Sequence, residues 1–115
     1  MCGFFAPIDT KSIIRDQSWK DAINRIGGEC MEELGKETTL QKFIELSRHF
    51  SLETKLASDQ IKEVMREIPH ASMAMLGQTV FVVTNEPEEI EKQLRKFTLR
   101  LSVSKISNQG AHVIL

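Results

Sequence analysis

The chain of 115 residues carries 15 Lys and Arg against 16 Asp and Glu, a formal net charge of −1, and 41% of its residues are hydrophobic. This length suits one soluble domain, residues 1–115, and the balanced charge argues against nucleic acid as a partner. Two cysteines are too few for a disulfide scaffold, and no apolar run is long enough to span a membrane, so the sequence predicts a cytoplasmic protein with no membrane partner.

The first half is predicted to hold one strand and several helices. Residues 2–6 are apolar and precede a proline, which is typical of a short strand, and residues 10–15 are expected to form a loop running into a helical turn. An amphipathic helix is predicted from Ser18 to Leu34, with Gly35 as its stop. The pair Gly27-Gly28 inside it predicts a kink, a break or a close contact with another helix.

Two more helices follow in the sequence. Thr38 and Gln41 have capping-box spacing before an apolar face that reaches Phe50. Ser58 or Asp59 is expected to cap the next helix, and Pro69 ends it, because the residue before a proline is disfavoured in the helical region.

The second half reads mainly as strands. Residues 78–84 are rich in β-branched and aromatic side chains and predict a buried strand, and Asn85 is expected to cap a helix reaching Phe97. Residues 99–104 alternate as a half-exposed strand, residues 107–110 have turn chemistry, and residues 111–115 read as a last strand. The order β-α-α-α-β-α-β-β predicts an α+β fold, with helices grouped on one face of a mostly antiparallel sheet.

No complete active site is evident from the residue types alone. Cys30 and His70 could be combined as nucleophile and base, but Cys30 lies on the apolar face of its helix, where thiols usually act as small hydrophobes. His70 follows a helix end, where it can equally serve the helix dipole. The glutamate pairs have the spacing of solvated helix surfaces. We therefore predict no catalytic and no metal-ligating residue.

One segment, residues 72–81, invites a functional interpretation. Small residues lead to Gly77 and then into the buried strand, and backbone N–H groups at such a bend can approach an anion such as phosphate. A single glycine before a strand is more often an ordinary turn, so both alternatives stay open here.

The segment Ser72-Met73-Ala74-Met75-Leu76-Gly77-Gln78-Thr79-Val80-Phe81 resembles the third conserved motif of archaeal pantoate kinases, a branch of the GHMP kinase superfamily. Residues 77–81 match the end of the motif's loop and its strand, while Ala74-Met75-Leu76 replaces the usual glycines. Residues 3–11 resemble the Gly-Pro-Ile-x-Thr segment that enters the C-terminal half of these enzymes. Residues 43–50, 56–58 and 110–113 follow in the family's order.

The resemblance concerns only the C-terminal domain of such a kinase. It implies an antiparallel four-stranded sheet with helices on one face, of the ferredoxin-like type. The N-terminal ATP-binding half, with its glycine-rich phosphate loop, is absent from these 115 residues. The resemblance thus implies the substrate-side part of an enzyme that transfers phosphate from ATP to pantoate in coenzyme A biosynthesis, inactive without its other half.

The resemblance also implies partners and site residues. ATP and Mg²⁺ belong to the complete enzyme, and none is expected to bind this chain alone. The expected partners are a small-molecule hydroxy acid and the N-terminal kinase half, if it is separately encoded. Thr10 and Lys11 would contact the substrate, although Thr10 could instead cap the following turn. The motif residues expected to pack under the phosphate loop of the other half are Ser72, Met73, Ala74, Met75, Leu76, Gly77 and Gln78.

A different class of function remains as an alternative. The chain could be a stand-alone module for small-ligand binding or dimerisation, without catalytic activity. In either case we expect exposed apolar surface around residues 73–76 and 4–5, because a domain separated from its partner exposes the face that the partner would cover.

Overall fold

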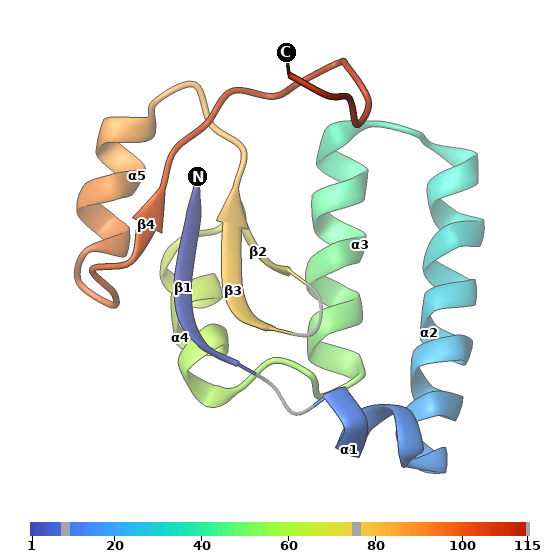
Figure 1. Cartoon of the computed structure of the whole chain (residues 1–115). Coiled ribbons are helices and arrows are strands. Elements are labelled where there is room, and N and C mark those ends of the chain that lie inside the picture. The colour runs from blue at the N-terminus through green and yellow to red at the C-terminus, as the bar shows by residue number, and fades with distance from the viewer. Residues whose placement is uncertain (8–9, 75–76, 115) are drawn as a thin grey trace.

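The computed structural model describes residues 1–7, 10–74 and 77–114. Within them the chain forms four strands and five helices (Figure 1). In chain order they are β1 (Cys2–Pro7), α1 (Thr10–Arg15), α2 (Gln17–Lys36), α3 (Leu40–Glu53), α4 (Asp59–Glu67), β2 (Ala71–Ala74), β3 (Gly77–Val82), α5 (Pro87–Leu94) and β4 (Leu101–Ser102). In this part of the chain no helix is both long and apolar enough to cross a membrane.

The four strands form one antiparallel sheet in the order β2-β3-β1-β4. The helix α4 lies on the connection from β1 to β2, and α5 lies on the connection from β3 to β4. This βαββαβ arrangement is the ferredoxin-like topology. The expected α+β fold class with a four-stranded antiparallel sheet is confirmed.

The core lies between the sheet and the two crossover helices. Strand residues alternate between faces, so Met73, Val80 and Val82 share the face that carries the core, and all three are nearly inaccessible to solvent. The helix α4 contributes residues at three- and four-residue steps, and α5 contributes Leu94. Figure 1 shows α4 behind the sheet. The α4 residues in this cluster are Ile61, Val64, Met65 and Ile68.

The helices α2 and α3 form a hairpin beside the edge strand β2 (Figure 1). The Trp19 indole nitrogen donates to the carbonyl of Thr54 at 2.9 Å, and the hydroxyls of Ser47 and Ser72 lie 2.6 Å apart. α2 runs without a break through Gly27, where an added Cβ would lie 3.4 Å from Phe50 of α3. Of the outcomes expected for the glycine pair, the close helix contact is the one that occurs.

The strand predictions differ from the structure in three segments. Residues 71–74 form β2, whereas they were expected only to lead into the next strand. Alanine, serine and methionine are weak strand formers, so β2 depends on its pairing with β3, for example Ala71 with Val82. The last predicted strand is wrong for residues 111–114, which are exposed coil, and Leu115 lies outside the described residues. The strand expected over 99–104 is reduced to residues 101–102.

Three helix caps also differ from those expected. Asp16, not Ser18, accepts the hydrogen bond that begins α2, and Thr39, not Thr38, caps α3. Glu86, rather than Asn85, stands at the start of α5 and makes no side-chain cap. Only the Ser58 cap of α4 was correctly placed. Each error is of one or two residues, because several neighbouring polar side chains could have capped the same turn.

Candidate functional site

Three segments meet at the end of the sheet where β1 finishes and β3 begins. The antiparallel register pairs Pro7 with Gly77 and Ala6 with Gln78, so the chain leaving β1 and the chain entering β3 lie side by side. The start of α4 reaches the same place through a hydrogen bond between Ser58 and Gln78. We call this end of the sheet the candidate site.

The helix α1 is held at this end of the molecule by its only buried side chain among those described. Ile13 is 3% exposed and belongs to the same buried cluster as Leu56 and Ala57, which directly precede Ser58. Burial of an isoleucine stabilises by about 2 kcal/mol, so it fixes this short helix against the body of the protein. Residues 10 and 11 lie in the first turn of α1, which Figure 1 shows at the lower end of the molecule.

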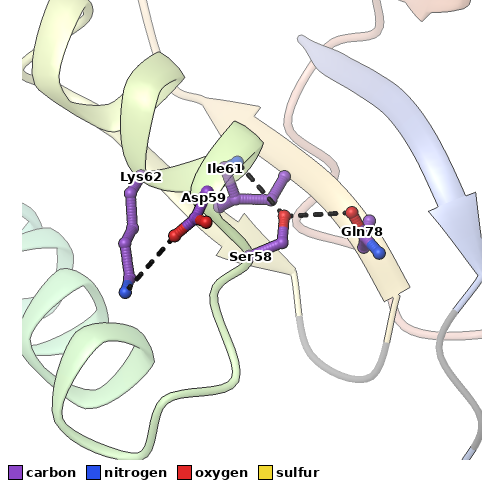
Figure 2. Close-up of polar contacts among 5 residues, drawn as sticks. All are labelled: Ser58, Asp59, Ile61, Lys62 and Gln78. Carbon is purple, nitrogen blue, oxygen red and sulfur yellow. Dashed lines mark hydrogen bonds and ion pairs between the residues drawn. The ribbon is translucent and has the colours of Figure 1, made fainter.

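Ser58 makes two hydrogen bonds with different roles (Figure 2). Its hydroxyl oxygen accepts from the backbone N–H of Ile61 at 3.3 Å, which caps α4, and lies 3.0 Å from Gln78 Oε1, to which it donates. Figure 2 shows the Gln78 amide nitrogen on the side away from Ser58. Among the described residues no acceptor receives a hydrogen bond from that nitrogen.

The charges around the cap are exposed. Lys62 Nζ lies 4.0 Å from Asp59 Oδ1, and both side chains are largely in solvent, so the pair contributes little stability. Asp59 in the first turn favours the helix dipole, while the first N–H groups of α4 carry partial positive charge. Lys11 is exposed on α1. The site therefore offers an amide donor beside the positive end of α4, and these groups suit a small anionic or hydroxylated molecule.

The structure brings some of the sequence-predicted site residues to this end. Gly77 begins β3 opposite Pro7, Gln78 is half-buried beside Ser58, and Lys11 lies in the first turn of α1. Thr10 begins α1, but its side chain is outside the described part of the chain. Met75 and Leu76 also lie outside the described residues.

The remaining motif residues have structural surroundings. Ser72 and Met73 are buried in β2, the serine against Ser47 of α3 and the methionine in the core, and Ala74 is half-buried. This corrects the expectation of a loop over residues 72–74, since their backbone groups take part in the ladder with β3. It also corrects the expected exposure at Met73, which is 2% exposed, whereas Phe4 is exposed as expected.

Sequence reasoning missed one residue of the site. Ser58 was recognised as a helix cap, but nothing in its local sequence indicated a contact with Gln78, 20 residues further along the chain. A capping serine is recognised from its neighbours, whereas its second partner is set by how α4 crosses the sheet.

The cysteine–histidine pairing finds no support in the geometry. Cys30 and His70 line different hollows of the surface. Burial and the neighbouring Glu29 raise the pKa of the Cys30 thiol, which favours the unreactive protonated form. No three His, Cys, Asp or Glu side chains gather as potential metal ligands within residues 1–7, 10–74 and 77–114.

A hollow that we call the apolar groove lies between the α2–α3 hairpin and the sheet. Its volume is about 410 Å³, and most of its lining is apolar. Met31 and Phe43 on its rim are 68% and 46% exposed. The other large side chains in it are Leu34, Leu46, Phe50 and Phe81.

The topology is that of a ferredoxin-like α+β domain with an inserted helical hairpin. The end of its sheet at the candidate site is polar and carries the Gln78 amide as a hydrogen-bond donor. The chain is 34% identical over 93 residues to the pantoate kinase of Methanocaldococcus jannaschii. The matching region covers 78% of this chain and 34% of that enzyme, so the chain spans about a third of the length of the curated relative it matches. The chain is thus a sequence relative of pantoate kinase, as the motif resemblance indicated.

Other comparisons give no match. No protein-family model matches the sequence. No solved structure matches it either.

Proposed function

We propose that this chain is the C-terminal, acceptor-side domain of an ATP-dependent small-molecule kinase of the pantoate kinase type, inactive without the N-terminal, nucleotide-binding half. The observation that carries the proposal is the sequence relationship to pantoate kinase over most of this chain. The position of Gln78, Ser58 and α1 at one end of the sheet adds support, because a polar end suits a hydroxy acid.

In this proposal the candidate site binds the acceptor. The Lys11 amine attracts the carboxylate of the hydroxy acid, and the Thr10 hydroxyl contacts the substrate directly. Gly77 and Gln78 pack under the phosphate loop of the other half. Phosphoryl transfer depends chiefly on positioning and charge stabilisation, so a domain that orients the acceptor contributes without a nucleophile of its own.

The residues of this chain do not fit a site for ATP and Mg²⁺. The sequence has no glycine-rich phosphate loop, and the described residues include no cluster of carboxylates suited to the metal. We therefore assign nucleotide binding to the N-terminal half of the kinase. We also propose a cytoplasmic location, because Cys2 and Cys30 are both unpaired, which fits a reducing compartment.

The proposal is tested by reconstituting the kinase. The reading frames next to the gene are searched for a glycine-rich phosphate loop, and the encoded polypeptide is mixed with this chain, ATP and pantoate. Release of ADP that requires both polypeptides and the acceptor is the expected result. No ADP release from the mixture, or ATP hydrolysis by the 115 residues alone, would contradict the proposal.

The apolar groove favours a second candidate, a dimerisation module. Exposed Met31 and Phe43 on the rim of an apolar hollow are typical of a surface that a partner covers. Light scattering on the purified chain distinguishes the two. A dimer that the Phe43→Glu substitution converts to a monomer supports the module, and a monomeric wild-type chain argues against it.

A further inference from the structure

We propose that Ser58 is a positioning residue: its hydroxyl fixes the orientation of the Gln78 amide so that Gln78 Nε2 donates a hydrogen bond to the carboxylate of the acceptor. The inference rests on the proposed function and deepens it, because it names a side chain that donates a hydrogen bond to the acid group and the residue that orients this side chain.

The hydrogen-bond pattern at Ser58 determines which end of the amide is free. A serine hydroxyl has one hydrogen to donate. The Ser58 oxygen already accepts from the Ile61 N–H, and its hydrogen is directed to Gln78 Oε1. With Oε1 engaged, the two N–H groups of Nε2 lie on the opposite side (Figure 2).

The free end of the amide lies where the acceptor is expected. Gln78 pairs with Ala6, one position before the end of β1, and from there the chain continues to Lys11. Gln78 is half-buried, and no described residue accepts from Nε2. A half-buried donor without an acceptor among the described residues is suited to an oxygen of a ligand, and the positive end of α4 next to it favours an anion.

Substitution of Ser58 by aspartate separates capping from positioning. Aspartate caps helices as well as serine does, so α4 keeps its start. An ionised carboxylate only accepts hydrogen bonds, so it would attract Nε2 and turn Oε1 toward the acceptor. The amide oxygen would then face the acceptor's carboxylate, which it does not bind.

The experiment uses the reconstituted kinase and compares four forms: wild type, Ser58→Thr, Ser58→Asp and Thr39→Asp. Thr39 is the matched control, because it caps α3 in the same way, accepting from the Lys42 N–H at 3.1 Å, and it lies on a different helix from Ser58. We expect Ser58→Asp to raise KM for pantoate about tenfold to a hundredfold, the effect of one hydrogen bond to a charged group, with kcat nearly unchanged. Ser58→Thr and Thr39→Asp should both retain the wild-type KM.

Two further measurements define the role. With the carboxamide analogue of pantoate, Ser58→Asp should have no comparable effect on KM. In nitrogen-15 NMR spectra of the chain alone, the Gln78 side-chain amide signals should shift in Ser58→Asp and stay in place in Thr39→Asp. Equal melting temperatures for the two aspartate variants exclude a loss of folding.

The outcomes separate the two proposals. An active wild type with an unchanged KM in Ser58→Asp overturns the positioning role and leaves the kinase function standing. A KM that rises equally for acid and carboxamide overturns the assignment of the carboxylate. A wild type without acceptor-dependent turnover contradicts the kinase function, and the acceptor-binding role of Gln78 fails with it.

Discussion

Arg48 joins α3 to the end of α4 by supplying a donor that the helix lacks. The carbonyl of Met65 would accept a hydrogen bond from the residue four positions on, but that residue is Pro69, which has no N–H. Arg48 Nη2 donates to the Met65 carbonyl at 2.8 Å, and Nη1 donates to the carbonyl of Ala71 at the start of β2. Partial burial lowers the pKa of Arg48, yet a guanidinium stays charged at any physiological pH.

We predict that Arg48→Met lowers the free energy of unfolding by about 3 kcal/mol, because it leaves buried carbonyls without donors. Urea denaturation of the purified chain measures the change. Arg25→Met is the control. The Arg25 side chain is 67% exposed and forms an ion pair with Glu29 at 3.8 Å, so its loss should cost under about 0.5 kcal/mol. Similar losses for both variants would show that the Arg48 contacts contribute nothing special.

Cys30 makes the folded chain less stable at alkaline pH. Its thiol pKa is raised above the ordinary value of 9.0, chiefly by burial, so the folded state favours the protonated form. This contribution is fully present below the unfolded pKa and is lost as the pH rises through the folded pKa. We predict that the urea midpoint of the wild type falls more steeply above pH 9.0 than that of Cys30→Ala. Parallel curves for the two proteins would refute this.

At the scale of elements, α2 shows how packing overrides a local signal. A pair of glycines inside a helix suggests a break, yet α2 continues to Lys36 because its hairpin with α3 supports it. Gly27 faces Phe50, and Gly28 faces open space. The glycine at 27 thus allows the two helices to approach, whereas the glycine at 28 serves no contact in the structure.

We predict opposite effects for substitutions at these two neighbouring positions. Gly28→Ala should stabilise the protein by about 1 kcal/mol, because alanine restricts the unfolded chain and nothing lies within 4 Å of the new Cβ. Gly27→Leu should destabilise it, because the larger side chain would displace Phe50. Thermal unfolding measures both. Gly28→Leu is the control for side-chain size and should cost little.

The elements also show which parts of the fold local sequence patterns can predict. The helix α4 was predicted from its cap to its end, because Ser58, an apolar stripe and Pro69 are three independent local signals. The strand β2 was not, because its residues are weak strand formers that become a strand only beside β3. In the candidate site, Gln78 was selected through the family motif, while Ser58 was known only as a cap.

At the scale of the whole molecule, the C-terminal segment lies outside the packed layers. β4 ends at Ser102, and residues 103–114 are exposed coil, with Val113 and Ile114 81% and 88% exposed. Residues 103–106 still line a hollow beside the end of β3, whereas the hydrogen bonds among the described residues beyond them are local, such as that of His112 Nδ1 with the Gly110 carbonyl at 2.9 Å. Residues 107–114 therefore add no strand to the sheet and no side chain to the buried core.

We predict that deletion of residues 107–115 changes the melting temperature by no more than about 2 °C, since exposed coil buries little apolar surface. Differential scanning calorimetry of the full and shortened chains makes the comparison. Deletion of residues 101–115, which removes β4 and Leu101 from the core, is the positive control and should lower the melting temperature clearly. A large loss in the shorter deletion would restore the interpretation of residues 111–115 as a strand.

The sequence by itself determined the features that depend on neighbours along the chain: the stripe and cap of α4, the apolar run of β3, and the segment that resembles a motif of pantoate kinases. Only the tertiary structure decided that Ala71–Ala74 is a strand, that residues 111–114 are not, and that Ser58 holds Gln78. The reason is physical. Helical periodicity and capping act over three or four residues, whereas strand pairing and side-chain contacts across 20 residues depend on which surfaces the folded chain brings together.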